Sequence, residues 1–278
     1  MLYLFSVFTL FEPVSPRIVG MGTAFTTASG GVTSLFWNPA GMMGDKGVVA
    51  SGFSFCGINW FEGGYSFPAG RLTVGIGVKG MFSGEMDALN EDADVEGKFS
   101  WTSFAPVAGF SWMINPDFYV GVGLKPFYEK VSNFTSYGIS MDAGMIRIFP
   151  LGEKEVFLGL LLKDMGYRIK PFVEEKEYHY EIRAGLGYLA EKLFFSLEYS
   201  YPYGVAAGLS WRVSSLLAFS FGYNHLYKET GTGSGMDIFN GITMGMEFLK
   251  DNYSLEFSFN PMGVLGPAVR GGVVYMLR

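Results

Sequence analysis

The chain has 278 residues, of which 17% are aromatic and only 17% charged, and 39 are glycine. Its mean hydropathy of +0.24 is high for a water-soluble protein, yet glycine, serine or a charge interrupts every apolar run before the ~18 residues of a helical membrane span are complete. The net charge of -6 argues against nucleic acid as a partner, and the single cysteine, Cys56, rules out an internal disulfide.

Residues 1–11 are apolar and have the length of the hydrophobic region of a secretory signal peptide, although no Lys or Arg precedes them. We interpret residues 1–14 as the remnant of a signal peptide, with the mature chain beginning near Glu12 or Ser15. The alternative is an ordered strand or helix that packs on the rest of the protein.

Residues 12–45 lack any two-residue alternation and hold several glycines, among them those at 20, 22, 30, 31 and 41. Such an irregular segment is too apolar to be a solvated tail, so we assign residues 15–45 to a plug, or hatch, folded inside a barrel. A periplasmic tail is the alternative. Within it, proline at 39 bars Asn38 from helical geometry and the asparagine side chain can bond nearby backbone, which predicts a rigid, architectural bend over Asn38, Pro39, Ala40 and Gly41.

From residue 46 to 278 the chain repeats runs of about ten residues that alternate in polarity and end in turn residues, the pattern of transmembrane β-strands. In 253–260, for example, Tyr253, Leu255, Phe257 and Phe259 interleave with polar residues. The sequence therefore predicts an all-β fold, a transmembrane antiparallel β-barrel of about fourteen strands. The predicted spans are 47–56, 58–67, 71–82, 98–113, 117–130, 134–149, 155–164, 178–190, 193–201, 203–213, 215–227, 238–249, 252–260 and 267–277.

The predicted connections alternate in length. The even-numbered ones are tight, whereas the long ones, at 83–97, 165–177, 228–237 and 261–266, all fall at odd positions. Short periplasmic turns and longer outer loops are typical of bacterial barrels, so we expect a location in the bacterial outer membrane with both termini periplasmic. Trp60, Trp101, Trp112 and Trp211 lie near strand ends, as expected of interfacial belts.

The alternation also places charges of both signs on the inner face. The residues concerned are Glu62, Lys79, Lys125, Asp142, Lys163, Glu181, Arg183, Glu198, Arg212, Glu247, Glu256 and Arg270. Folding each hairpin about its turn sets three pairs opposite each other, which we expect within ~4 Å: Asp142 with Lys163, Arg183 with Glu198, and Glu256 with Arg270. A salt-bridged filling of a narrow barrel explains such pairs better than an ion pore, which would favour a ring of one sign.

Two short motifs resemble a known family. GMGTAF, which begins with Gly20, Met21 and Gly22, and LFWNPAGM, which contains Asn38–Gly41, are similar to the N-terminal signature of the FadL-like family of outer-membrane proteins. That family includes long-chain fatty-acid transporters and PorV-type secretion barrels. The resemblance implies that the Asn-Pro-Ala motif belongs to a hatch that closes a fourteen-stranded barrel.

An enzyme is not expected. The two histidines, His179 and His225, fall on opposite faces of their predicted strands and so cannot form a nucleophile–base dyad, and with one cysteine they offer no metal site and no cofactor site. The favoured hypothesis is FadL-like passive uptake of a hydrophobic small molecule past the plug. The alternative is a structural or PorV-like barrel that holds a secretion partner protein. Inward glycines at 121, 123, 185, 187, 245 and 272 leave room for a ligand or, better, for the plug.

Overall fold

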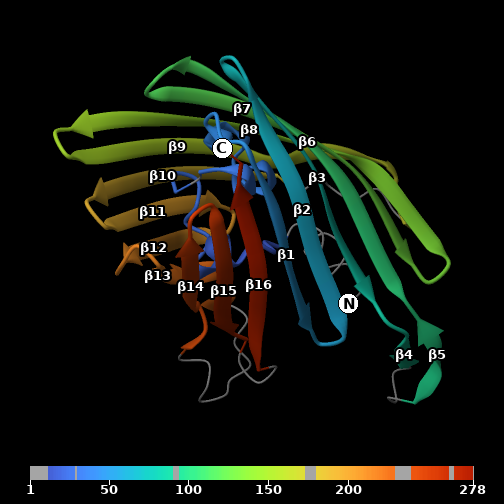
Figure 1. The fold of residues 1–278 in the computed structure, drawn as a ribbon. Coiled ribbons are helices and arrows are strands. Elements are labelled where there is room, and N and C mark those ends of the chain that lie inside the picture. The colour runs from blue at the N-terminus through green and yellow to red at the C-terminus, as the bar shows by residue number, and fades with distance from the viewer. Residues whose placement is uncertain are drawn as a thin grey trace.

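The computed structural model describes residues 12–28, 30–89, 94–172, 180–228, 239–262 and 266–277, which form a closed antiparallel barrel (Figure 1). Neighbouring strands are consecutive in the chain, apart from a small hairpin between the third and fourth, and the last strand pairs with the first. The barrel strands are β1 (Gly47–Phe55), β2 (Ile58–Ala69), β3 (Leu72–Ser83), β6 (Trp101–Asn115), β7 (Phe118–Val131), β8 (Phe134–Leu151), β9 (Lys154–Lys170), β10 (Glu181–Ala190), β11 (Leu193–Tyr201), β12 (Gly204–Arg212), β13 (Leu217–Asn224), β14 (Ile242–Lys250), β15 (Tyr253–Pro261) and β16 (Pro267–Met276).

The outer face of the barrel is apolar and the inner face polar. On β15, Tyr253, Leu255, Phe257 and Phe259 are exposed while the alternate residues are buried. Because water cannot satisfy backbone groups inside a bilayer, a closed barrel with such a band is suited to spanning a membrane, as the barrels of bacterial outer membranes do. The prediction of a fourteen-stranded antiparallel barrel is therefore confirmed, and its apolar outer face supports a location in the outer membrane.

The clearest departure from the predicted spans is β9, which continues to Lys170 through a predicted loop. A bulge explains it: Met141 pairs with Met165 and Ala143 with Leu162, so that Lys163 and Asp164 together face Asp142. The extra residue reverses the parity of the strand. Before the bulge the even-numbered Leu160 and Leu162 face outward, and after it the odd-numbered Tyr167 and Ile169 do. In the sequence this change resembles the end of the alternation.

Other departures are local. The predicted loop 83–97 contains a hairpin of β4 (Met86–Leu89) and β5 (Val95–Phe99). Strand β13 ends at Asn224, whose side chain accepts a hydrogen bond from the Leu226 amide and begins the short helix α3 (His225–Lys228), so His225 does not lie on a lipid-facing strand. His179 lies outside the described residues. The expected inward Arg212 is exposed at the end of β12.

The tryptophans divide between the two faces. Trp112 and Trp211 are exposed on the outer face, as expected of an interfacial belt. Trp60 and Trp101, by contrast, are buried inside the barrel in a cluster with Val14 and Met81, so their assignment to the belt is wrong. Trp60 lies two positions before the inward Glu62, and Trp101 two positions before the inward Ser103, so each tryptophan points to the same side of its strand as that residue.

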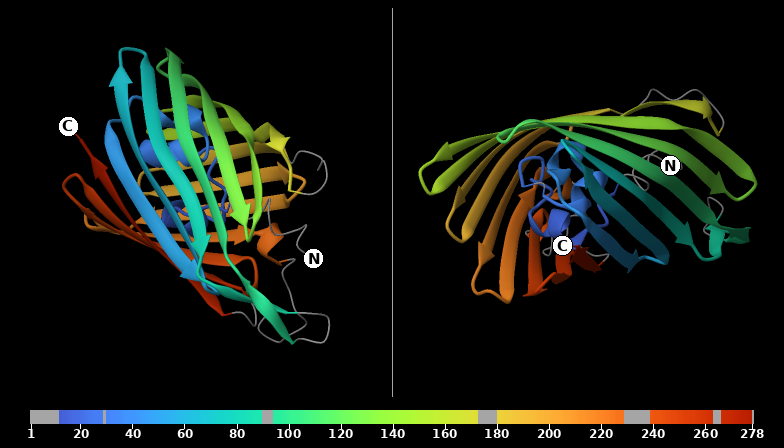
Figure 2. Two further views of the ribbon diagram at one scale, coloured as in Figure 1. Left: turned by 90° about the vertical axis from the view of Figure 1, so that its right-hand side faces the viewer. Right: turned by 45° about the horizontal axis from the view of Figure 1, so that its top comes forward.

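Residues 12–28 and 30–45 run inside the barrel, and we call them the luminal segment (Figure 2). It contains the helix α2 (Pro16–Gly20) and the 3-10 helices η1 (Val32–Phe36) and η2 (Pro39–Met42), which are buried almost throughout. No helix among the described residues is long and apolar enough to cross a membrane. Glu12 and Val14, which we placed in the signal-peptide remnant, contact the barrel interior, whereas residues 1–11 lie outside the described part of the chain.

The even-numbered connections between barrel strands are all tight and lie at one end of the barrel, and the longer connections all lie at the other end, as the sequence predicts. That second end also has the tight turns of β1–β2, β7–β8 and β11–β12. The described chain starts close to the second end, because Glu12 pairs with Arg270 near the beginning of β16. Met276 lies at the first end, where β16 pairs with the start of β1. The periplasmic placement of both termini stays a prediction.

Candidate functional site

The Asn38–Gly41 bend is fixed by hydrogen bonds of its own and of the wall. Asn38 has extended backbone geometry before Pro39, its side-chain oxygen accepts from the Ala40 amide at 3.2 Å, and its side-chain nitrogen donates to the Thr26 carbonyl at 2.9 Å. From β6, the Ser111 hydroxyl donates to the Ala40 carbonyl at 2.9 Å. The structure thus places this motif as a rigid bend against the wall.

Glycines in the wall leave room for the backbone of this bend. A Cβ built on Gly121 of β7 would lie 2.5 Å from the carbonyl carbon of Pro39 and 2.7 Å from the Cα of Ala40. One built on Gly144 of β8 would overlap the side-chain oxygen of Asn38. Only glycine lets two backbones approach this closely, so wall and segment are complementary at backbone level.

The Gly20–Met21–Gly22 motif is held in the same way on the opposite part of the wall. The Gly22 amide donates to the Thr243 hydroxyl at 3.0 Å, and Gly22 has a φ of +62°, which favours glycine. A Cβ on Gly208 of β12 would lie 2.5 Å from the Met21 carbonyl oxygen. Close approach explains why small residues recur both in the motif and in the strands that face it.

A ladder of buried charges crosses the inner wall from β7 to β11. Lys125 binds Asp142 at 2.8 Å and also Asp164, and Lys163 binds Asp164 at 2.7 Å and approaches Glu181 to 3.8 Å. Arg183 continues the ladder, binding Glu181 at 2.6 Å and also Glu198. Buried charges are costly unless they are paired and hydrogen-bonded, and this chain of contacts satisfies that requirement.

The luminal segment is docked on this ladder. The Glu198 carboxylate accepts a hydrogen bond from the Thr26 amide at 2.9 Å, and Arg183 donates to the Thr23 carbonyl at 3.1 Å. The buried ring of Trp37 lies 4.9 Å from the Lys163 ammonium and 4.4 Å from the Arg183 guanidinium. Two cations against one indole form strong cation–π contacts in a site that excludes water.

The three predicted pairs have different fates. Arg183 and Glu198 form an ion pair as predicted. They do not lie directly opposite each other, because the turn is centred at Glu191–Lys192 and this offsets them by two residues. Asp142 faces the bulge at Lys163 and Asp164, and its ion-pair partner at 2.8 Å is Lys125.

The predicted pair of Glu256 with Arg270 is not formed among the described residues. Arg270 lies opposite Ser258 and binds Glu12 at 2.8 Å and the Pro13 carbonyl at 3.1 Å. Glu256 lies opposite Glu247 on β14. The connection before β16 is centred one residue later than assumed, and this moves the facing residue by two positions.

Two charged groups of the luminal segment itself have shifted pKa values. Arg17 lies 3.5 Å from Glu247, and this carboxylate raises the pKa of the Arg17 guanidinium. Burial raises the pKa of the Asp45 carboxyl above its usual range, more than the Gly31 amide and Arg17 lower it. The segment is thus bound to the wall at both ends, by Arg17 near its start and by the Asp45 carbonyl, which accepts from Ser66 at 2.9 Å.

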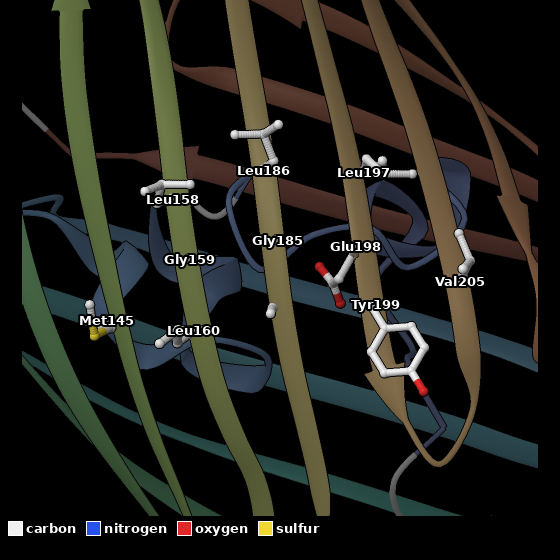
Figure 3. Close-up of a pocket in the computed structure, with 11 residues that line it drawn as sticks. Met145, Leu158, Gly159, Leu160, Gly185, Leu186, Leu197, Glu198, Tyr199 and Val205 are labelled. Atoms are coloured by element: carbon white, nitrogen blue, oxygen red, sulfur yellow. The ribbon is translucent and has the colours of Figure 1, made fainter.

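Two apolar pockets lie side by side on the outer face of the wall, over strands that the segment contacts from inside, and Figure 3 shows the larger one. The larger, of about 510 Å³, crosses β8–β12 between outward leucines such as Leu158 and Leu186, over Gly159 and Gly185. The smaller, of about 380 Å³, adjoins it over β7–β10 and shares Met145 and Leu160. A Cβ on Gly159 would lie 2.9 Å from the Thr27 side chain, so here only the strand backbone separates the pocket from the luminal segment.

Comparison with known proteins shows likeness in structure. No family model matches this chain, and no curated protein matches it in sequence. The Ralstonia pickettii toluene transporter TbuX has a TM-score of 0.62 at 10% identity, over 96% of this chain and 99% of that one. The CymD monoaromatic hydrocarbon channel has a TM-score of 0.63 at 11% identity, and the match covers 98% of this chain and 99% of that one. A deltaS2 mutant of the TodX monoaromatic hydrocarbon channel has a TM-score of 0.58 at 11% identity, and the match covers 97% of this chain and 99% of that one.

The chain has the fold of these channels. Such low identities speak for the fold alone, and the match extends over nearly the whole length of both chains. The fourteen-stranded barrel implied by the FadL-like resemblance is therefore confirmed.

Proposed function

We propose that this protein is a FadL-like outer-membrane transport protein through which a hydrophobic small molecule passes by diffusion, with the luminal segment as its plug. One observation carries the proposal: the chain shares its fold, end to end, with a toluene transporter and monoaromatic hydrocarbon channels, and has apolar pockets on the outer face of the wall that the segment contacts from inside. Ligand sites are concave and mostly apolar, and both pocket volumes are in the usual range.

Support for a plug comes from the way residues 15–45 are held. The Asn38–Gly41 bend, the Gly20–Gly22 motif and Trp37 contact separate parts of the wall through hydrogen bonds, backbone approach and cation–π contacts. Diffusion would drive the flow, because the outer membrane has no nucleotide supply and the sequence contains no P-loop.

The alternative function, a scaffold for a secretion partner, needs no apolar pocket next to the plug. The two wall pockets therefore favour transport of a hydrophobic compound. Mass spectrometry of the lipid extract of the purified protein tests the choice: a co-purified hydrocarbon supports transport, whereas a stoichiometric partner protein without any hydrocarbon supports the scaffold.

A direct test measures the uptake of radiolabelled toluene by a Gram-negative host that has no hydrocarbon channels of its own. We expect faster initial uptake when this chain is in the outer membrane. Ala184→Trp fills the larger pocket from the lipid side and should abolish most of the gain, whereas Ala108→Trp, outside both pockets, should not. Equal uptake by cells with and without the chain would refute the proposal.

A further inference from the structure

Two lysines lie close together on the outward face of the barrel, near the end with the longer connections. Lys130 of β7 lies opposite Thr135 of β8, and the Lys170 ammonium of β9 donates to the Thr135 hydroxyl at 2.9 Å. Both lysines are exposed, and neither forms an ion pair among the described residues. Two positive charges thus lie beside one hydroxyl, although like charges that are neighbours in a sheet destabilise it.

A β-bulge places Lys170 on this face. Gly138 of β8 pairs with Arg168, and Tyr137 pairs with Lys170. Ile169 therefore has no residue opposite it. Because side chains alternate between the faces of a strand and Arg168 points inward, Lys170 would point inward too if the extra residue were absent. Bulges redirect side chains at functional positions, and here the redirected side chain is a cation.

Tyrosines lie next to the two lysines, on the side toward the middle of the barrel. Tyr128 of β7 pairs with Tyr137 of β8, and Tyr167 of β9 is 63% exposed on the same face. Tyrosine is enriched where the hydrocarbon of a membrane meets its polar layer. Lys130 lies two residues beyond Tyr128, about 7 Å further along the strand. The lysines are therefore at the depth of the lipid headgroups.

The charge of this face is positive. Among the described residues, the outward positions of β6–β9 in this half of the barrel hold Lys130 and Lys170 and no acid. Longer connections face the cell exterior in bacterial outer-membrane barrels, so this depth corresponds to the outer leaflet. That leaflet is built of a glycolipid whose sugars carry phosphates. Phosphate accepts strong hydrogen bonds from ammonium groups, and it would remove the repulsion between the two lysines.

We infer that Lys130, Thr135 and Lys170 bind a phosphate of an outer-leaflet glycolipid, with Tyr128 and Tyr137 against its sugar and the start of its acyl chains. The site is on the lipid-facing side of the wall, so it is separate from the luminal segment and does not depend on what the protein transports. It would fix β7–β9, the part of the wall with the longest strands, in the outer leaflet.

The test measures the affinity of the purified full chain, in a neutral detergent, for diphosphorylated lipid A, for the same glycolipid without phosphates, and for phosphatidylglycerol. Native mass spectrometry counts the bound lipid. We expect the diphosphorylated glycolipid to bind most tightly and its advantage to shrink as salt is added. Lys130→Gln combined with Lys170→Gln should weaken its binding about tenfold, the factor that two partly screened ion contacts supply.

Lys192→Gln combined with Lys250→Gln is the matched control, because it removes the same charge from exposed lysines at the opposite end of the barrel. This variant should bind the glycolipid as the wild type does. Heat-modified electrophoretic mobility verifies that each variant forms a barrel. Equal losses in the two double variants, or no loss in the first, would overturn the inference.

The lipid comparison tests the wild-type protein without any substitution. Phosphatidylglycerol that binds as tightly as the diphosphorylated glycolipid would refute a site for the glycolipid. Equal binding of the glycolipid with and without phosphates would refute the role of the lysines. Displacement of the glycolipid by an equal concentration of inorganic phosphate would indicate a site for the free anion instead, and would also overturn the inference.

Discussion

Replacement of Gly121 by alanine tests whether close backbone approach holds the luminal segment in place. The new Cβ would overlap the Ala40 backbone nitrogen and lie 2.5 Å from the Pro39 carbonyl carbon, whereas ordinary contacts begin at 3.4 Å, so the bend must move by at least 3.4 minus 2.5, about 0.9 Å. The obstacle is backbone, which no change of rotamer relieves. The shift strains the hydrogen bonds that Ala40 accepts from Ser111 and that Asn38 donates to Thr26.

If both bonds are lost and their polar atoms stay buried, the bound position is destabilised by about 3 kcal/mol, and the detached population of the bend rises roughly a hundredfold. Amide hydrogen exchange of residues 36–44, followed by mass spectrometry in the folded barrel, measures this population. Gly123→Ala is the control, because its Cβ would have its nearest contact at 3.6 Å on the same strand and face. Equal exchange in the two variants would refute the argument.

Two further substitutions probe the docking of the segment. Trp37→Leu removes the contacts with Lys163 and Arg183, and should lower the free energy of segment release by about 2–4 kcal/mol, measured by hydrogen exchange of residues 32–38, while Trp112→Leu on the lipid face has no such effect. Because burial raises the pKa of Asp45, its contribution to stability is full below the ordinary value of 3.8 and is lost as the pH rises through the folded value. Asp45→Asn should therefore raise the denaturation midpoint at neutral pH and leave the midpoint unchanged below pH 3.8. A midpoint that changes only below pH 3.8 would contradict burial as the cause.

The barrel could be predicted because its cause is local. One apolar and one polar face per strand leave a period of two in the sequence, and this period located each of the fourteen barrel strands, though not the hairpin of β4 and β5. The prediction failed where geometry breaks the period: at the bulge of Lys163 and Asp164 two residues face one, so β9 seemed to end there. A reversal of parity between Leu162 and Tyr167 was the available signal.

The contacts of the site were harder to predict because they join distant parts of the chain. Parity correctly turns Lys125 and Glu181 inward, but their partners depend on a register that a shift of one residue in the turn moves by two positions. The sequence around Trp37 does not predict the cations that lie against its ring, since Lys163 and Arg183 are more than a hundred residues away. Glycine at 121 and 144 did leave a signal, as inward positions without a side chain.

Arg183 connects the two halves of the proposed mechanism. It lines the smaller wall pocket and, through the Thr23 carbonyl and Trp37, holds the luminal segment. A ligand that displaced β10 at this pocket would also shift the guanidinium that docks the segment on the inner face, so occupancy of the pocket and release of the segment would be coupled in both directions. The coupling cannot exceed the difference in contact energy that Arg183 makes in the two states.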